Sequence, residues 1–144
     1  MNGCAMALLA AGLAGCFAGP RVGERVDAGP VDPVVGFRAL QDAVFTPTCA
    51  VSQCHAGAPP PRAPMSLEPE QAYASLVDAP SFEAPALSRV TPGAPARSYL
   101  LFKLRGTAAS VGGTGTRMPL GKDMLSDSMI QAIESWVARG APND

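Results

Sequence analysis

Half of the cysteines of this chain and its only histidine lie within seven residues, in the stretch CAVSQCH. The stretch begins at Cys49 and ends with Cys54 and His55. Two thiols and an imidazole can bind a transition metal, form a disulfide or attach a haem. We therefore weigh three interpretations: a metal site, a disulfide beside an unrelated histidine, and a site of covalent haem attachment.

Zinc and a disulfide each explain only part of this cluster. A structural zinc ion needs four ligands, and no other Cys or His follows position 16, so we do not expect zinc. Cys49 and Cys54 can pair if the chain turns between them, although so small a loop stabilises a fold only modestly. The disulfide interpretation leaves His55 unexplained.

Haem attachment accounts for all three side chains. Two thiols can add to the vinyl groups of a haem, and a histidine directly after the second cysteine can then bind the iron as its fifth ligand. This interpretation requires a sixth ligand from elsewhere in the chain, and a methionine thioether is the usual one in electron-carrying haems.

The composition fits one small domain with an additional group at its centre. The 144 residues include fifteen Gly and fifteen Pro, and the net charge is −1. Short helices separated by long loops are expected, and no nucleic-acid surface is indicated. Because so small a domain buries little apolar area alone, a disulfide or a prosthetic group is favoured.

The N-terminal segment is typical of export. Residues 5–17 are apolar and uncharged, too few to span a bilayer but suited to a secretory signal. The sequence LAGC, ending at Cys16, resembles the lipobox of bacterial lipoproteins, in which the cysteine is acylated. No Lys or Arg precedes the apolar run, a departure from the pattern, and cleavage of an ordinary signal peptide at another small residue is the alternative.

The predicted organisation has three parts. Residues 1–16 form a signal peptide with a lipobox, residues 17–35 a flexible linker rich in Gly, Pro and charge, and residues 36–144 the folded domain. No strand pattern or internal repeat is present, so the fold class is all-α.

Apolar periodicity predicts four short helices in this domain. The first carries Phe37, Leu40, Val44 and Phe45 on one face, and Pro47 prevents its regular continuation. The second spans residues 69–77, and the third spans residues 97–105 and is closed by Gly106.

The fourth helix is the clearest, and it follows an irregular segment. Residues 106–116 are rich in Gly and Thr, and we expect them to form a mobile loop. Ser126 or Asp127 can cap the last helix, and Gly140 ends it. Its apolar stripe comprises Ile130, Ile133, Trp136 and Val137.

Taken together, these motifs resemble those of the small monohaem c-type cytochromes, especially the exported, often lipid-anchored domains of bacteria. The resemblance spans Phe37 to about Ala141. It rests on the first helix, CAVSQCH, RVTPGAPARSYLLFKLRG, RMPLG and the closing helix ending in SWVARGA. It implies a cytochrome c-like all-α fold, with four short helices and long Gly/Pro-rich loops around one covalent haem c.

The resemblance also implies roles for four residues. Cys49 and Cys54 are the thioether donors, His55 is the proximal ligand, and Met118 is the distal ligand. The usual motif has two residues between the cysteines, whereas this one has four, residues 50–53. We expect the two extra residues to bulge away and leave Cys54 and His55 in the required relation.

Three other methionines compete with Met118 for the iron. Met124 is the strongest competitor, Met129 is expected to be core filler, and Met65 is expected to pack on the edge of the haem ring. Met118 is preferred because a Gly/Thr loop precedes it and Pro119 stiffens its exit.

Residues around the haem can also be named. Backbone carbonyls of residues 58–64 are candidate acceptors for the second imidazole N–H, and Arg97, Lys103 and Arg117 are candidate partners of the haem propionates. Trp136, Phe45 and Leu104 are expected to form the haem wall.

The expected function is electron transfer by an exported, lipid-anchored, single-haem protein facing the periplasm, in the periplasm or at the outer membrane. We expect a monomer that works with redox partner proteins and is not an enzyme. If Met118 is not bound, ligand sensing or peroxidase-like chemistry becomes the variant. The alternative is a haem-free lipoprotein domain with a Cys49–Cys54 disulfide, acting as a binding or structural module of the envelope.

Overall fold

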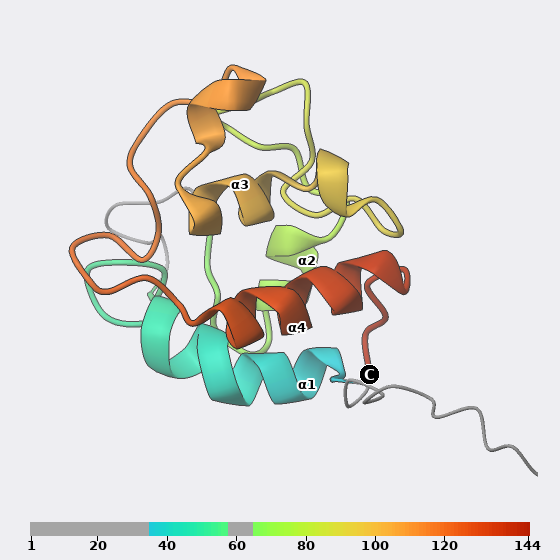
Figure 1. The fold of residues 1–144 in the computed structure, drawn as a ribbon. Coiled ribbons are helices and arrows are strands. Elements are labelled where there is room, and N and C mark those ends of the chain that lie inside the picture. The colour runs from blue at the N-terminus through green and yellow to red at the C-terminus, as the bar shows by residue number, and fades with distance from the viewer. Residues whose placement is uncertain (1–34, 58–64) are drawn as a thin grey trace, which may run out of the picture. The chain divides into compact units, whose positions relative to one another are not determined.

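A computed structural model describes residues 35–57 and 65–144 of the chain (Figure 1). Within these residues all regular structure is helical, apart from isolated bridges between single residue pairs, so the predicted all-α class is confirmed. The elements in chain order are α1 (Phe37–Leu40), η1 (Gln41–Cys49), α2 (Ala72–Leu76), η2 (Pro95–Arg97), α3 (Tyr99–Arg105), η3 (Ala108–Val111) and α4 (Asp127–Ala138).

Two sets of predictions fall on residues that the structure does not describe. The signal peptide with the lipobox at Cys16, and all of the residue 17–35 linker except Val35, lie outside the described ranges. So do the backbone carbonyls of residues 58–64. None of the helices in the described part of the chain combines the length and the apolar character needed to cross a membrane.

The first helical segment continues past Pro47, although not as an α-helix. At Gln41 the α-helical turns of α1 give way to the wider π-helical turns of η1, which end at Cys49. The backbone N–H of Ala50 donates to the carbonyl of Phe45, five residues earlier, at 2.7 Å. Proline has no N–H to donate, and the helical segment continues through Pro47 with the wider π-helical turns. The first cysteine is thereby placed at the end of this helical segment.

The predicted α4 forms with its predicted cap. The Ser126 hydroxyl accepts the backbone N–H of Met129 at 3.3 Å and satisfies one of the free donors at the start of the helix. The apolar stripe is buried as predicted, and it comprises Ile130, Ile133, Trp136 and Val137.

An aromatic cluster joins the two ends of the folded region. The centroid of the Phe37 ring lies 5.4 Å from the ring centroid of Trp136, 6.0 Å from that of Phe45 and 5.2 Å from that of Tyr73. Such pairs add to the stabilisation from burial alone. Because Phe37 belongs to α1 and Trp136 to α4, these two helices share one core and lie against each other in Figure 1.

The two middle helices are shorter than predicted at their starts. Residues 69–71 form turns, so α2 begins at Ala72. Residues 95–97 form the short 3₁₀ segment η2, so α3 begins at Tyr99. The predicted end of α3 is confirmed, because Gly106 adopts a left-handed conformation with φ of 72°.

Residues 106–116 are more ordered than the sequence predicts. They contain the 3₁₀ segment η3, in which Ala108 is buried. The Thr114 carbonyl accepts hydrogen bonds from the side chains of Tyr99 and Lys103 in α3. The expected mobile loop is thus a segment whose backbone is fastened to the neighbouring helix. The pattern of Gly and Thr gave no sign of these contacts, because they involve side chains from another element.

Candidate functional site

One mainly apolar cavity of about 710 Å³ brings the predicted site residues together. Cys49, Cys54, His55 and Met118 all line it, although Met118 lies far from the other three in sequence. Its size falls within the range of cofactor and ligand sites, which is about 300–1,000 Å³. The sequence pattern therefore identified four side chains that the fold places around one space.

The widened spacing between the cysteines is accommodated by a turn. The Cys54 N–H donates to the Val51 carbonyl at 3.0 Å, and the His55 N–H donates to the Cys49 carbonyl at 3.2 Å. Gln53 adopts a positive φ of 73°, which reverses the chain just before the second cysteine. The four intervening residues thus form a hydrogen-bonded turn that returns Cys54 and His55 to the end of η1.

Both thiols of the motif are free in the structure. Burial raises the pKa of the Cys49 thiol to about 11, against the opposing influence of the nearby Lys122 ammonium. The Cys49 side chain is therefore a neutral thiol at physiological pH. The Cys49 thiol can form a disulfide with Cys54, or it can bond to a group that enters the cavity.

The imidazole of His55 is held in its neutral form. Burial lowers its pKa below the usual value, and the positive charge of Arg89 lowers it further, while the Met65 carbonyl has the opposite effect. Neutral imidazole is the state that binds metal ions. Within the described residues, Nδ1 of His55 is buried and has no hydrogen-bond partner, and the predicted acceptors at residues 58–64 lie outside those residues.

Met118 belongs to a segment that follows α3, and a backbone hydrogen bond holds it in place. Its N–H donates to the carbonyl of Lys103 in α3 at 3.0 Å. A little further along, the Lys122 ammonium donates to the Thr48 carbonyl at 3.3 Å and ties this segment to the end of η1. The segment that carries Met118 is therefore connected to both α3 and the cysteine-bearing element.

The competing methionines differ in where they lie. Met124 is 53% exposed and does not line the cavity, and Met129 is 41% exposed, so the expectation that Met129 fills the core is wrong. Met65 lines the cavity, and its backbone carbonyl acts to raise the pKa of His55. Of the two methionines that reach the cavity, only Met118 comes from a segment remote from the histidine in sequence.

The expected polar partners are only partly placed at the cavity. Lys103 lines it, but Arg97 and Arg117 do not. The guanidinium of Arg117 instead donates to the Met118 carbonyl at 3.4 Å and to the Lys122 carbonyl at 3.0 Å.

Lys103 and Lys122 line the cavity together with a further cation, Arg89, which sequence reasoning missed. It lines the cavity and donates to the Ser75 carbonyl at 2.7 Å. Nothing in the local sequence distinguishes Arg89 from the other scattered arginines, because its position depends on the folding of the loop between α2 and α3.

The walls of the cavity also differ in part from the expectation. Phe45 and Leu104 line it, but Trp136 does not. The indole of Trp136 packs against Phe37 in the helical core and donates to the Pro142 carbonyl at 2.9 Å. Its position on the inner stripe of α4 predicted burial correctly but could not say which buried surface it meets.

Comparison with known proteins adds no relative: no protein-family model, curated protein or solved structure matches this chain. Among residues 35–57 and 65–144, no group of three or more His, Cys, Asp or Glu side chains is arranged to hold a metal ion. A site with one histidine and one methionine as its ligands is a different kind of site, because methionine is not one of those residue types. The site is therefore interpreted from its own chemistry.

Proposed function

We propose that this chain is an exported single-haem electron-transfer protein with a cytochrome c-like fold. Cys49 and Cys54 attach haem c through thioether bonds, and His55 and Met118 are the axial ligands of its iron. Residues 1–16 act as the export signal, with lipid attachment at Cys16. The observation that carries the proposal is the convergence of two thiols, an imidazole and a thioether on one cavity.

The donor set suits this cofactor better than it suits a bare metal ion. Two thiols of the described region match the two vinyl groups of a haem, whereas a four-ligand zinc site lacks ligands. His55 is neutral and has a buried Nδ1 left free within the described residues. The apolar lining, which includes Phe45 and Leu104, suits a flat hydrophobic ring.

When bound, haem supplies one-electron redox chemistry at its iron. The chain's own residues would then have three tasks: the cysteines would hold the group covalently, the apolar wall would exclude water, and His55 and Met118 would bind the iron. Because His55 and Met118 would both hold the iron, they would leave no open position for oxygen or peroxide. Electron transfer with partner proteins, without substrate chemistry, is the function that this arrangement supports.

The cavity also offers a cation for the haem carboxylates. Arg89 and His55 line the same cavity, and Arg89 is only half-buried. Within residues 35–57 and 65–144 its guanidinium makes one hydrogen bond, to the Ser75 carbonyl, and further N–H groups can donate to an acceptor in the cavity. The sequence suggested Arg97, Lys103 and Arg117 for the propionate contact; Lys103 lines the cavity, and we add Arg89 in place of the two arginines that do not.

Covalent attachment is tested by mass measurement under denaturing conditions. The full chain is produced in a host with a cytochrome c maturation system, next to Cys54→Ser and Cys49→Ser variants. We expect the mass of the processed chain plus one haem, retained after unfolding, and less attached haem in each variant. A chain of unmodified mass reduced by two hydrogens would instead support the Cys49–Cys54 disulfide and the haem-free envelope module.

A further inference from the structure

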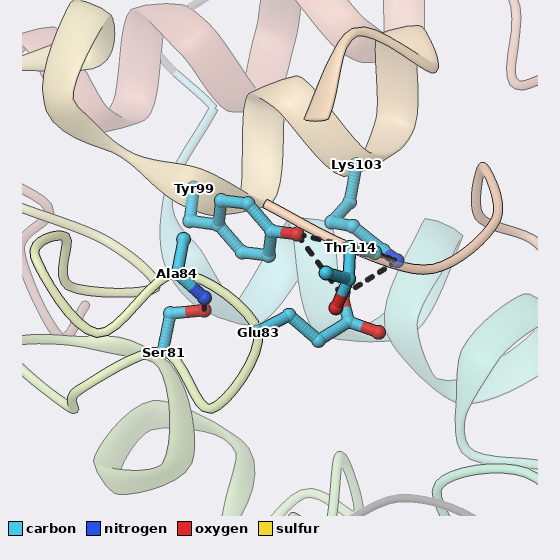
Figure 2. Close-up of polar contacts among 6 residues, drawn as sticks. All are labelled: Ser81, Glu83, Ala84, Tyr99, Lys103 and Thr114. Atoms are coloured by element: carbon cyan, nitrogen blue, oxygen red, sulfur yellow. Dashed lines mark hydrogen bonds and ion pairs between the residues drawn. The ribbon is translucent and has the colours of Figure 1, made fainter. Parts of the chain in front are cut away.

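A hydrogen-bonded cluster lies between α3 and the loop that leads to Met118 (Figure 2). The Tyr99 hydroxyl is 3.0 Å from Glu83 Oε2 and 3.1 Å from the Thr114 carbonyl, so its hydrogen is directed at two acceptors. The Lys103 ammonium is 2.7 Å from Glu83 Oε2 and 3.3 Å from the same carbonyl. We call Glu83, Tyr99 and Lys103 the loop clamp.

Two of the three clamp residues are buried, and the Glu83 side chain is 32% exposed. Tyr99 and Lys103 are 4% and 7% exposed, and each has acceptors within hydrogen-bonding distance. The turn that carries Glu83 is itself closed by a hydrogen bond from the Ala84 N–H to Ser81 Oγ at 3.1 Å. A buried polar group without its partners is costly, so these residues favour the one loop conformation that brings the Thr114 carbonyl to them.

The loop passes so close to the clamp that two glycines are required. A Cβ at Gly113 would lie 2.5 Å from Cε2 and 2.8 Å from Cζ of Tyr99. A Cβ at Gly115 would lie 2.9 Å from Nζ of Lys103, and Gly115 also has a positive φ of 81°. The Gly-rich composition that suggested mobility is therefore explained by close packing.

Lys103 connects the clamp directly to Met118. Its side chain holds the Thr114 carbonyl, and its own carbonyl accepts the Met118 N–H at 3.0 Å. The loop is thus fastened to a single residue of α3 at two points, four residues apart. Glu83 and the Thr114 carbonyl take up two of the three donors of the Lys103 ammonium.

We propose that Glu83, Tyr99 and Lys103 are positioning residues that hold the loop and keep the Met118 thioether at the iron. This inference rests on the proposed function, since it concerns the sixth ligand of the haem. The three clamp residues also line the cavity, and the role proposed for them is to hold the loop. Loss of the clamp lets the Met118 sulfur leave more often, without affecting the thioether bonds or His55.

The test removes one hydroxyl from the clamp and one from elsewhere. Tyr99→Phe deletes the clamp hydroxyl; Tyr73→Phe is the matched control, because its hydroxyl donates to the Ala141 carbonyl in the helical core at 2.9 Å. In matured, haem-loaded full chain, binding of imidazole to the oxidised iron reports how readily Met118 leaves. For the loss of one hydrogen bond we expect Tyr99→Phe to tighten imidazole binding about two- to tenfold. A weaker sulfur-to-iron charge-transfer band should accompany it, with neither change in Tyr73→Phe.

Equal imidazole affinity in Tyr99→Phe and the parent chain, or an equal change in both variants, would overturn the inference. If the matured chain carries no haem, the proposed function fails, and the clamp is then judged by amide exchange at Met118. Faster exchange in Tyr99→Phe than in Tyr73→Phe would support the loop clamp in that case. Equal exchange would reject it as well.

Discussion

The two sides of the cavity are built in different ways. On the histidine side, Cys49, Cys54 and His55 are positioned by backbone hydrogen bonds within one short turn at the end of η1. On the methionine side, the Met118 N–H donates to the carbonyl of Lys103 in α3, and the Lys103 ammonium pairs with Glu83, which is more distant still in sequence. The first side is determined locally, whereas the second depends on the tertiary fold, so damage to each should have a different signature.

The largest effect is expected from breaking the histidine side. His55→Ala removes the imidazole while leaving both thiols in place, and the proposed fifth ligand is lost. We expect matured His55→Ala to accumulate little or no covalent haem, measured by haem staining of denaturing gels and by mass. Haem content equal to that of the parent chain would show that His55 is not needed at the iron.

Breaking the methionine side should spare attachment. Met118→Ala removes the thioether but none of the attachment residues, so haem content is expected to be unchanged. The sulfur-to-iron charge-transfer band should vanish and the reduction potential should fall, since a methionine ligand raises it. Optical spectra and potentiometric titration measure both.

Met124→Ala is the matched control for that variant, because Met124 is exposed and lies outside the cavity. It should retain the band and the potential. Loss of the band in Met124→Ala, with retention in Met118→Ala, would reassign the sixth ligand.

The buried thiol predicts a pH dependence of the haem-free, reduced chain. Burial raises the pKa of Cys49 from 9.0 to about 11. A folded-state pKa above the unfolded one favours the protonated folded form. The associated stability is therefore fully present below about pH 9 and is lost as the pH rises towards about 11. Urea unfolding across this range should show the decline in the parent chain and a smaller one in Cys49→Ala; matching slopes would contradict it.

A smaller effect should come from crowding the loop clamp. Gly113→Ala places a methyl group against the ring of Tyr99, and overpacking of this kind costs about 1–3 kcal/mol of unfolding free energy. Ala109→Ser, at an exposed position of the same loop, should change stability by less than about 0.5 kcal/mol. Denaturant unfolding of both variants measures the difference, and equal stabilities would argue against close packing at Gly113.

The same contrast explains how much the sequence could predict. The face of the first helix, the Ser126 cap and the buried stripe of α4 depend on local periodicity and capping, and all three are confirmed. The grouping of Cys49, Cys54 and His55 follows from their proximity in the chain. These features need only a few residues to specify them.

Contacts between distant segments could not be predicted in this way. Arg89 reaches the cavity, and Tyr99 meets the loop at Thr114, only because the chain folds back between α2 and η3. The Gly residues of the loop were consistent with mobility or with close approach, and only the neighbouring ring of Tyr99 decides between them. Trp136 was predicted to be buried, but its partner, Phe37, belongs to the other end of the fold.

The central claim is tested most directly by a reduced-minus-oxidised optical spectrum of the full chain, purified from a host that can attach haem. A single covalent haem bound by His55 and Met118 predicts a red protein with a sharp α-band on reduction. A colourless protein without this band, from a host in which a known c-type cytochrome matures normally, would contradict the account.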